Sequence, residues 1–261
     1  MFIAPDCREL LELNGLDKFE KVWNAEADWI ETPNRDRGGW SGVGRMSLAL
    51  PGGGECIAFL KRQQNHARLS FRHPIKGETT LAREFTIIRR LERHGISTLK
   101  PMLFGVCEHD GEQLAVLMTE ELTGYQPLDE LIKNGKVQAM PLRQKRQLLA
   151  AIADFVRQMH AAGVEHRSLY AKHLFVKRDG NGFGIAIIDL EKSRVSLMPF
   201  LRMVSDLISL NYRTGTLSRT SRLYFYRHYC GGRKLNAWDK LYLRYIIARS
   251  YKKRLKSESN A

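Results

Sequence analysis

The order of hydrophobic patterns along the chain constrains its fold more than any other feature. Strand patterns occur near residues 45–50 and 57–61, after a glycine-rich turn and on either side of a second turn at residues 51–54. Asp110-Gly111 is the turn signal of a second hairpin. Helical spacing returns at residues 141–160 and again from about residue 198 onward. Strands and helices that are segregated along a chain favour an α+β fold.

Three stretches predict helices. Residues 7–30 predict one or two short helices that break at Asn14-Gly15. Residues 80–94 predict an amphipathic helix, whose buried face carries Leu81, Phe85, Ile88 and Leu91. Residues 141–160 predict a long helix, whose buried face carries Leu148, Ile152, Phe155, Val156 and Met159.

We therefore expect a bilobal protein with a small β-rich N-lobe, which contains one helix, and a mainly helical C-lobe. The predicted boundaries are an N-terminal helical extension over residues 1–34, the N-lobe over 35–122, and the C-lobe with basic C-terminal helices over 123–261. The C-lobe also contains a strand pair around the turn at residues 179–182, and its second strand is IAIID. A cleft between two lobes is a natural site for a small molecule.

Composition excludes several classes of protein. No stretch reaches the roughly 18 apolar residues that a membrane span needs. The N-terminus meets Asp6 and Glu9 without a basic region, which argues against a secretory signal. The four cysteines lie far apart and form no CxxC pair, so we expect a reducing cytoplasm and no zinc or disulfide framework.

Positive charge is concentrated at the end of the chain. The net charge is +14, and residues 201–261 hold 14 Lys or Arg against 3 acidic residues. Such a surface attracts nucleic acid, anionic lipid headgroups or a polyanionic substrate. The segment contains no helix-turn-helix or aromatic RNA-binding signature, so we expect no specific nucleic-acid binding.

The chain contains, in order, the parts that phosphoryl transfer requires. Such a reaction needs its phosphates held, their charge neutralised and the acceptor hydroxyl aimed. Lys61 ends the second strand, Glu84 follows 23 residues later on the helix, and Asp189 ends the strand IAIID. The segment from His166 to His173 resembles a catalytic loop. The first turn contains glycines whose amides could approach phosphates, namely Gly38, Gly39, Gly42 and Gly44.

These motifs together resemble the lipopolysaccharide kinase InaA family, the WaaP-like bacterial relatives of protein kinases. The resemblance is carried by HRSLYAKHLF, AIIDLEKSR, LAREF and GISTLKPMLFGV, and it extends over roughly residues 10–250. It implies a protein-kinase-like fold with an αC-type helix in the N-lobe. It also implies ATP- and Mg²⁺-dependent phosphorylation of a sugar, typically a heptose of the lipopolysaccharide inner core.

The resemblance also implies a role for each matching residue. Lys61 would hold the α- and β-phosphates of ATP, with Glu84 as its ion-pair partner, and Asp189 would hold magnesium. His173 stands where protein kinases have a metal-binding Asn, and a neutral imidazole is a poor ligand for Mg²⁺. Asp206 would support the catalytic loop from a helix. The remaining nucleotide-binding residues would be Gly39, Gly42 and Gly44 for phosphate and the 118–122 hinge, with Met118, Glu120 and Leu122, for adenine.

Ser168 departs from the family pattern, because an Asp at this position accepts the proton of the acceptor hydroxyl. A serine hydroxyl can position an acceptor but is no base near neutral pH. We therefore expect a slow kinase, a kinase whose base comes from elsewhere, or a pseudokinase. The pseudokinase would bind nucleotide or a partner in envelope or stress regulation. The candidates for compensating groups are Glu191, Asp179 and Lys172.

The C-terminal segment LNAWDKLYLRYIIARSYKKRLK predicts a basic amphipathic helix, with Leu241, Tyr245 and Ile246 near one face. Such a helix either lies on an anionic membrane or packs on the C-lobe with a solvated cationic face. For an enzyme that modifies a lipopolysaccharide core saccharide, the first arrangement suits the cytoplasmic face of the inner membrane.

Overall fold

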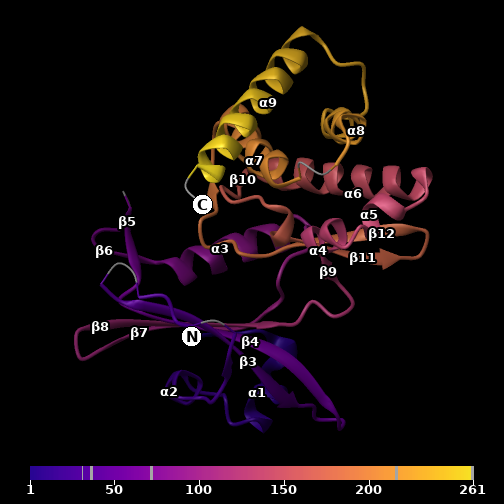
Figure 1. Ribbon diagram of the computed structural model, residues 1–261. Coiled ribbons are helices and arrows are strands. Elements are labelled where there is room, and N and C mark those ends of the chain that lie inside the picture. The colour runs from indigo at the N-terminus through magenta and orange to yellow at the C-terminus, as the bar shows by residue number, and fades with distance from the viewer. Residues whose placement is uncertain (31, 36–37, 71–72, 215–216, 260–261) are drawn as a thin grey trace. The chain divides into compact units, whose positions relative to one another are not determined.

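The computed structural model describes residues 1–30, 32–35, 38–70, 73–214 and 217–259 (Figure 1). The chain forms two compact units. Unit 1 comprises Met1–Arg89 and Leu99–Thr123, and unit 2 comprises Arg90–Thr98 and Gly124–Ala261. In the described part of the chain, no helix is both long enough and apolar enough to cross a membrane.

Unit 1 is built on an antiparallel six-stranded sheet. In spatial order its strands are β1 (Phe2–Ile3), β7 (Pro101–His109), β8 (Glu112–Glu120), β4 (Glu55–Gln64), β3 (Trp40–Ala49) and β2 (Asp28–Trp29). The two predicted hairpins are present: β3 and β4 flank the turn at residues 51–54, and β7 and β8 flank Asp110-Gly111. A separate hairpin, β5 (Ala67–Ser70) and β6 (His73–Thr79), leads into the helix and lacks a clear sequence signal.

Helix α3 (Thr80–Arg93) follows the predicted pattern closely. Leu81, Ile88 and Leu91 are buried as predicted. Phe85 is only partly buried, because its ring lies at the rim of the core and stacks on Phe104 with a centroid distance of 4.4 Å. The apolar face of this helix is therefore one residue wider than predicted, since Ile87 is also buried.

The N-terminal segment belongs to the core of unit 1. It contains a 3-10 turn (Pro5–Cys7), α1 (Arg8–Leu13) and α2 (Phe19–Trp23), in addition to strands β1 and β2. Leu11 and Val22 are fully buried in one cluster with Leu60 and Met118 of the sheet. Residues 1–30 thus cover one face of the sheet and extend it at both edges.

Unit 2 is mainly helical, as predicted. Its helices are α4 (Leu128–Lys133), α5 (Lys136–Ala139), α6 (Leu142–Ala161), α7 (Pro199–Arg213), α8 (Arg219–Tyr229) and α9 (Ala237–Glu258). Its strands are β9 (Gln126–Pro127), β10 (Val164–Glu165), β11 (Leu174–Asp179), β12 (Gly182–Ile187) and β13 (Arg194–Val195). The predicted apolar face of α6 is buried over its whole length.

Two sequence-based boundaries need correction. Gly42 and Gly44 do not lie in a turn, because β3 already begins at Trp40 and both glycines pair with β4. The strand expected to end at Asp189 ends at Ile187, and Asp189 follows with a left-handed φ of 60°. Both differences move candidate site residues relative to the secondary structure that holds them.

Candidate active site

The predicted ion pair of unit 1 is present. Lys61 of β4 lies with its Nζ 2.6 Å from Oε1 of Glu84 on α3. The lysine side chain is 19% exposed and the glutamate side chain 1%. A carboxylate that deeply buried requires a charge partner, because an unpaired buried charge is strongly destabilising. The pair therefore holds the lysine ammonium at a defined position on the sheet.

A buried amide fixes the strand and helix that carry this pair. Gln63, the neighbour of Lys61 on β4, donates from Nε2 to Thr80 Oγ1 at 2.5 Å. Its Oε1 accepts the backbone N–H of Leu81 at 3.2 Å. The second contact satisfies a backbone N–H in the first turn of α3, where such groups lack helical partners, and the first ties Gln63 to the side chain of Thr80 in the same turn. Gln63 thus fixes the start of α3 beside β4, and Glu84, one turn further along the helix, lies within reach of Lys61.

The three glycines assigned to phosphate binding have a local packing reason to be glycine. A Cβ at Gly42 would lie 2.4 Å from the Trp29 ring, and one at Gly44 would lie 2.6 Å from the Cβ of Ala27. A Cβ at Gly39 would lie 2.0 Å from the carbonyl oxygen of Gln64. Gly42 and Gly44 therefore allow the preceding segment to approach β3 closely, and Gly39 allows close approach to the end of β4. Their contact with phosphate stays a prediction.

The predicted hinge begins inside the core and ends at the surface. Met118 is fully buried in the unit 1 cluster, so its side chain cannot reach a ligand. Glu120 forms an ion pair with Lys100, with 3.2 Å between Oε2 and Nζ. The hydrogen bond that Lys100 donates to Asp6, together with the charge of Glu120, raises the pKa of the Lys100 ammonium. Leu122 is partly buried, and adenine contacts at this hinge remain a prediction.

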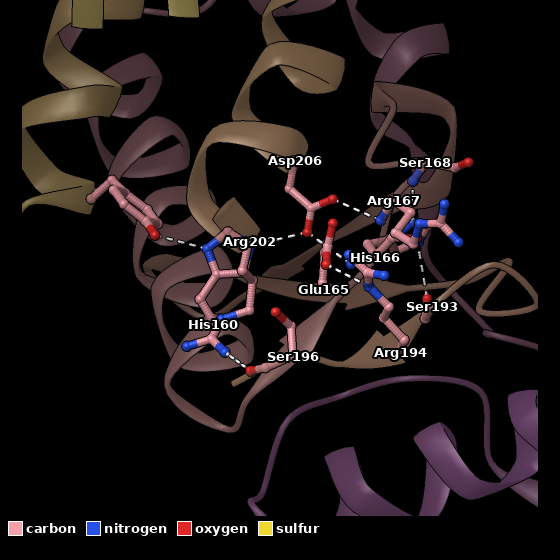
Figure 2. A network of polar contacts seen from close by, with 11 residues as sticks. His160, Glu165, His166, Arg167, Ser168, Ser193, Arg194, Ser196, Arg202 and Asp206 are labelled. Carbon is pink, nitrogen blue, oxygen red and sulfur yellow. Dashed lines mark hydrogen bonds and ion pairs between the residues drawn. The ribbon is translucent and has the colours of Figure 1, made fainter. Parts of the chain in front are cut away.

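In unit 2, the carboxylate of Asp206 on α7 holds the start of the segment from His166 to His173, the predicted catalytic loop (Figure 2). Its Oδ2 accepts the backbone N–H of His166 at 2.8 Å, and its Oδ1 accepts that of Arg167 at 2.7 Å. Asp206 is fully buried. Arg167 has a left-handed φ of 64°, a conformation that costs energy in a non-glycine residue. The expected support of the loop by Asp206 is confirmed.

Two further residues that the sequence did not single out complete this support (Figure 2). His160, at the end of α6, contacts Asp206 Oδ2 through Nε2 at 3.0 Å and Tyr229 Oη through Nδ1 at 2.7 Å. Burial raises the pKa of the Tyr229 phenol, so Tyr229 stays protonated and donates to Nδ1. His160 then carries its proton on Nε2 and donates it to Asp206. The sequence held one sign of this role, because His160 is a polar residue on the otherwise apolar face of α6.

His166 is fully used in holding the loop. Its Nδ1 accepts the backbone N–H of Ser168 at 3.3 Å, which leaves the ring proton on Nε2 for the carbonyl oxygen of Ile188 at 3.0 Å. Ser193 donates to the carbonyl oxygen of His166 at 3.4 Å. The imidazole thus joins the loop to the segment around Asp189, and this geometry describes a structural histidine.

His173, at the end of the loop, lies against the carboxylate of Asp189. His173 Nδ1 lies 2.8 Å from the carbonyl oxygen of Ser168, so this nitrogen donates, and Nε2 lies 3.1 Å from Asp189 Oδ2. Burial lowers the pKa of His173, although Asp189 opposes the shift. In its neutral form His173 presents a lone pair to a carboxylate that can only accept. A proton or a cation is therefore required to satisfy this pair.

The donor set at Asp189 fits a magnesium ion that is carried by a nucleotide. Mg²⁺ typically uses one or two carboxylates together with phosphate oxygens and water. The Asp189 side chain is 41% exposed, which leaves its carboxylate accessible. No group of three or more metal-binding side chains occurs among the described residues. His173 fits less well as a metal ligand, because it is buried and magnesium prefers oxygen.

The candidates for replacing the missing base differ in position. Asp179 lies at the far end of β11, five residues beyond Leu174, which corresponds to about 16 Å along an extended strand. It is therefore too far from the loop to act there. Lys172, the candidate for neutralising the γ-phosphate, is exposed within the loop, and Glu191, the other candidate base, is partly buried just after Asp189. These two remain candidates.

The catalytic loop is also contacted by the C-terminal helix, which the sequence did not predict. Lys253 of α9 donates from Nζ to Tyr170 Oη at 3.2 Å and to Ser209 Oγ at 3.4 Å. Just before the loop in sequence, buried Glu165 of β10 pairs with Arg194 of β13, with 2.8 Å between Oε2 and Nε. The loop is therefore held by α7, α9 and β13.

Comparison with solved structures identifies the class of protein. The structure titled "WaaP in complex with acyl carrier protein" matches with a TM-score of 0.70 and 24% identity, and it covers 98% of each chain. At this identity the match establishes the fold alone. The chain thus has the protein-kinase-like fold, with a β-sheet lobe and a helical lobe.

Sequence comparison identifies the family. The model of the lipopolysaccharide kinase (Kdo/WaaP) family matches residues 20–229. Protein InaA of Escherichia coli (strain K12) is 32% identical over 178 residues, which cover 68% of this chain and 79% of that protein. The lipopolysaccharide core heptose(I) kinase WaaP of the same strain is 31% identical over 160 residues, 59% of each chain. The chain belongs to the lipopolysaccharide kinase (Kdo/WaaP) family.

Proposed function

We propose that this protein is an ATP-dependent phosphotransferase that acts on a heptose hydroxyl of the lipopolysaccharide inner core. The buried Lys61–Glu84 pair is the observation that carries this proposal. A lysine fixed on a strand by a helix glutamate is the arrangement that protein kinases need for phosphate binding. The family membership supports the same chemistry, and the relative WaaP is named as a heptose(I) kinase.

In this proposal each residue that matches the family pattern has one role. Lys61 binds the α- and β-phosphates, and the segment from Glu120 to Leu122 binds adenine. The backbone near Gly39, Gly42 and Gly44 covers the phosphates. Asp189 holds Mg²⁺, which neutralises charge on the β- and γ-phosphates. The loop supported by Asp206 positions the sugar hydroxyl.

Ser168 limits the rate of the proposed reaction. General-base assistance is typically worth about 10²–10⁴ in rate, and a serine hydroxyl cannot provide it near neutral pH. Positioning and charge neutralisation supply much of the catalysis in phosphoryl transfer. We therefore propose a slow kinase, in which Ser168 orients the acceptor hydroxyl without removing its proton.

The alternative proposal is a pseudokinase that binds nucleotide or a partner in envelope or stress regulation. One observation favours it specifically. Both ring nitrogens of His166 are engaged in hydrogen bonds, and His173 is buried. Neither imidazole of the loop is therefore available as a substitute base. In this case the nucleotide site is retained and turnover is lost.

We propose that the protein works in the cytoplasm at the inner face of the inner membrane, where its basic C-terminal region contacts anionic lipid. The seven Lys or Arg of α9, against two acidic residues, support this placement. The same charge offers no sequence-specific nucleic-acid recognition, because it comes with no matching motif.

A phosphorylation assay tests the proposed activity directly. Purified protein is incubated with labelled ATP, Mg²⁺ and dephosphorylated core oligosaccharide, and incorporation is compared between the wild type and Asp189→Ala. The kinase proposal expects slow incorporation in the wild type and none in the variant. Equal background in both, together with ATP-dependent thermal stabilisation of the wild type, identifies the pseudokinase. If ATP gives neither turnover nor stabilisation, both proposals are wrong.

A further inference from the structure

The segment that leads into α7 exposes an unusual run of apolar side chains. Leu197 is 94% exposed, Met198 61%, Phe200 44% and Leu201 49%, and Pro199 separates the two pairs. Single exposed apolar residues are normal on a soluble protein, whereas a contiguous group marks an interaction site. Packing within unit 2 does not explain why four large apolar side chains are exposed side by side.

Helix α9 extends the same surface. Trp238 is 62% exposed, and Leu241 and Tyr245 follow it at helical spacing and are also exposed. Tyr242 joins the two segments, because its ring lies 4.7 Å from that of Phe200 and 6.2 Å from that of Trp238. We call the resulting surface the apolar patch; it consists of Leu197, Met198, Phe200, Leu201, Trp238, Leu241 and Tyr245.

The structure divides α9 differently from the sequence-based expectation. Ile246, which was grouped with Leu241 and Tyr245, is buried in unit 2. Ser250, one turn later, is also buried and donates to the carbonyl oxygens of Ile246 and Ile208. Ile246 and Ser250 thus lie on the face of α9 that is turned toward unit 2. Its outer face carries Trp238, Leu241 and Tyr245.

Cations continue the outer face of α9 beyond the patch. Arg249, Lys252 and Lys256 follow Tyr245 at intervals of four, three and four residues, and all three are exposed. The guanidinium of Arg249 lies 6.0 Å from the centre of the Tyr245 ring. Asp239, the acidic residue in the first turn of α9, is already paired with Arg233 at 2.6 Å. One stripe thus changes from apolar to cationic along the helix.

We infer that the apolar patch and this cationic stripe form a docking surface for an anionic lipid bilayer. Leucine, methionine and phenylalanine side chains enter the acyl-chain boundary, while tryptophan and tyrosine prefer the headgroup level. Lysine and arginine beside them attract anionic headgroups. A protein partner would fit the apolar part, but the adjacent row of three cations has its complement in a surface of closely spaced phosphates.

This inference deepens the proposed membrane location by naming the surface, and it does not depend on catalysis. Vesicle binding is measured without ATP or sugar, so a negative result leaves the kinase proposal untouched. Likewise, if the protein binds vesicles but transfers no phosphate, the docking surface is supported and the kinase proposal is not.

The test is flotation of the full chain with vesicles. One set contains phosphatidylglycerol and phosphatidylethanolamine, and the other contains phosphatidylcholine alone. We expect binding to the anionic vesicles and at least tenfold weaker binding to the neutral ones. The double variant Leu197→Ser/Phe200→Ser should lower anionic binding by at least tenfold. The double variant Arg249→Glu/Lys252→Glu should do the same and reduce the dependence of binding on salt.

Matched controls come from the start of α6, where Leu142 and Arg143 are also exposed. Leu142→Ser and Arg143→Glu should float like the wild type. Thermal unfolding verifies that each variant is folded. Trp238→Phe identifies the contribution of Trp238 to fluorescence, which brominated lipids should quench in the wild type only when the patch meets the bilayer.

Several results would overturn the inference. They are equal binding to both vesicle sets, patch variants that float like the wild type, and absence of quenching. Light scattering provides a further one. If the patch variants abolish a dimer of the wild type or a complex with an acidic soluble protein, and no variant changes vesicle binding, the surface serves a protein contact instead.

Discussion

His160 of α6 and Asp206 of α7 are joined by a 3.0 Å contact between Nε2 and Oδ2, and the same carboxylate accepts two backbone N–H groups of the catalytic loop. Through this one buried group, helix packing determines the position of the loop. The charge of Asp206 is tolerated in the core because three donors surround it.

Asp206→Ala should therefore be among the most destabilising single changes in unit 2. Loss of the carboxylate leaves the N–H groups of His166 and Arg167 without their acceptor and releases the strained backbone at Arg167. We expect the free energy of unfolding to fall by about 3–5 kcal/mol, measured by urea denaturation. Asp154→Ala removes an exposed ion pair with Arg157 and should cost less than about 1 kcal/mol. Similar losses in both variants would contradict this account.

The Lys61–Glu84 pair predicts a compensation between two substitutions. Lys61→Met leaves the Glu84 carboxylate buried without its ammonium and should lower stability by up to about 3 kcal/mol, since the lysine is partly exposed. Adding Glu84→Gln removes the buried charge and should recover most of that loss. Neither variant should be stabilised by ATP, which thermal shift measures. If the stability lost in the double variant equals the sum of the losses in the two single variants, Lys61 and Glu84 are not coupled.

Ser168→Asp should increase phosphate transfer if the missing base limits the reaction. The gain expected from a general base is about 10²–10⁴ in kcat. The same substitution in an Asp189→Ala background should give no gain, because the metal ligand is absent. An unchanged rate in Ser168→Asp, with ATP binding intact, would show that the nucleotide site has lost more than its base.

Gly42→Ala should destabilise the protein in the absence of any nucleotide. The added methyl would lie 2.4 Å from the Trp29 ring, so β2 and β3 must separate. Overpacking of this kind costs about 1–3 kcal/mol. Gly52→Ala is the control, because it has open space around it, and its effect should stay within about 0.5 kcal/mol. If the Gly42→Ala protein is as stable as the wild type, packing against Trp29 does not require this glycine, and only the proposed contact with phosphate is left to explain it.

Cys7 should be unreactive in the folded protein. Burial, followed by the charge of Asp6, raises the pKa of its thiol to about 11. Because the folded pKa lies above the unfolded value, this group contributes stability below about pH 9 that is lost as the pH rises through 11. A chain with Ser at the other three cysteines should react with a thiol reagent at pH 8 only in denaturant. Equal rates in native and denaturing buffer would contradict the prediction.

Much of the fold was predictable from local patterns. The hairpins around residues 51–54 and Asp110-Gly111, helix α3 and helix α6 all lie where periodicity and turn residues place them. The Lys61–Glu84 pair was also predictable, because its strand and helix were both recognisable and only the family resemblance was needed to connect them.

The sequence by itself determined the elements, their order and the identity of the residues that can do chemistry. Only the tertiary structure decided that His160 and Tyr229 support Asp206, that Lys253 reaches Tyr170, and that Ile246 is buried while Tyr245 is exposed. Periodicity arises from contacts between residues a few positions apart. The partner of a buried polar group, or the side of a helix that stays uncovered, depends on elements tens of residues away that no local pattern encodes.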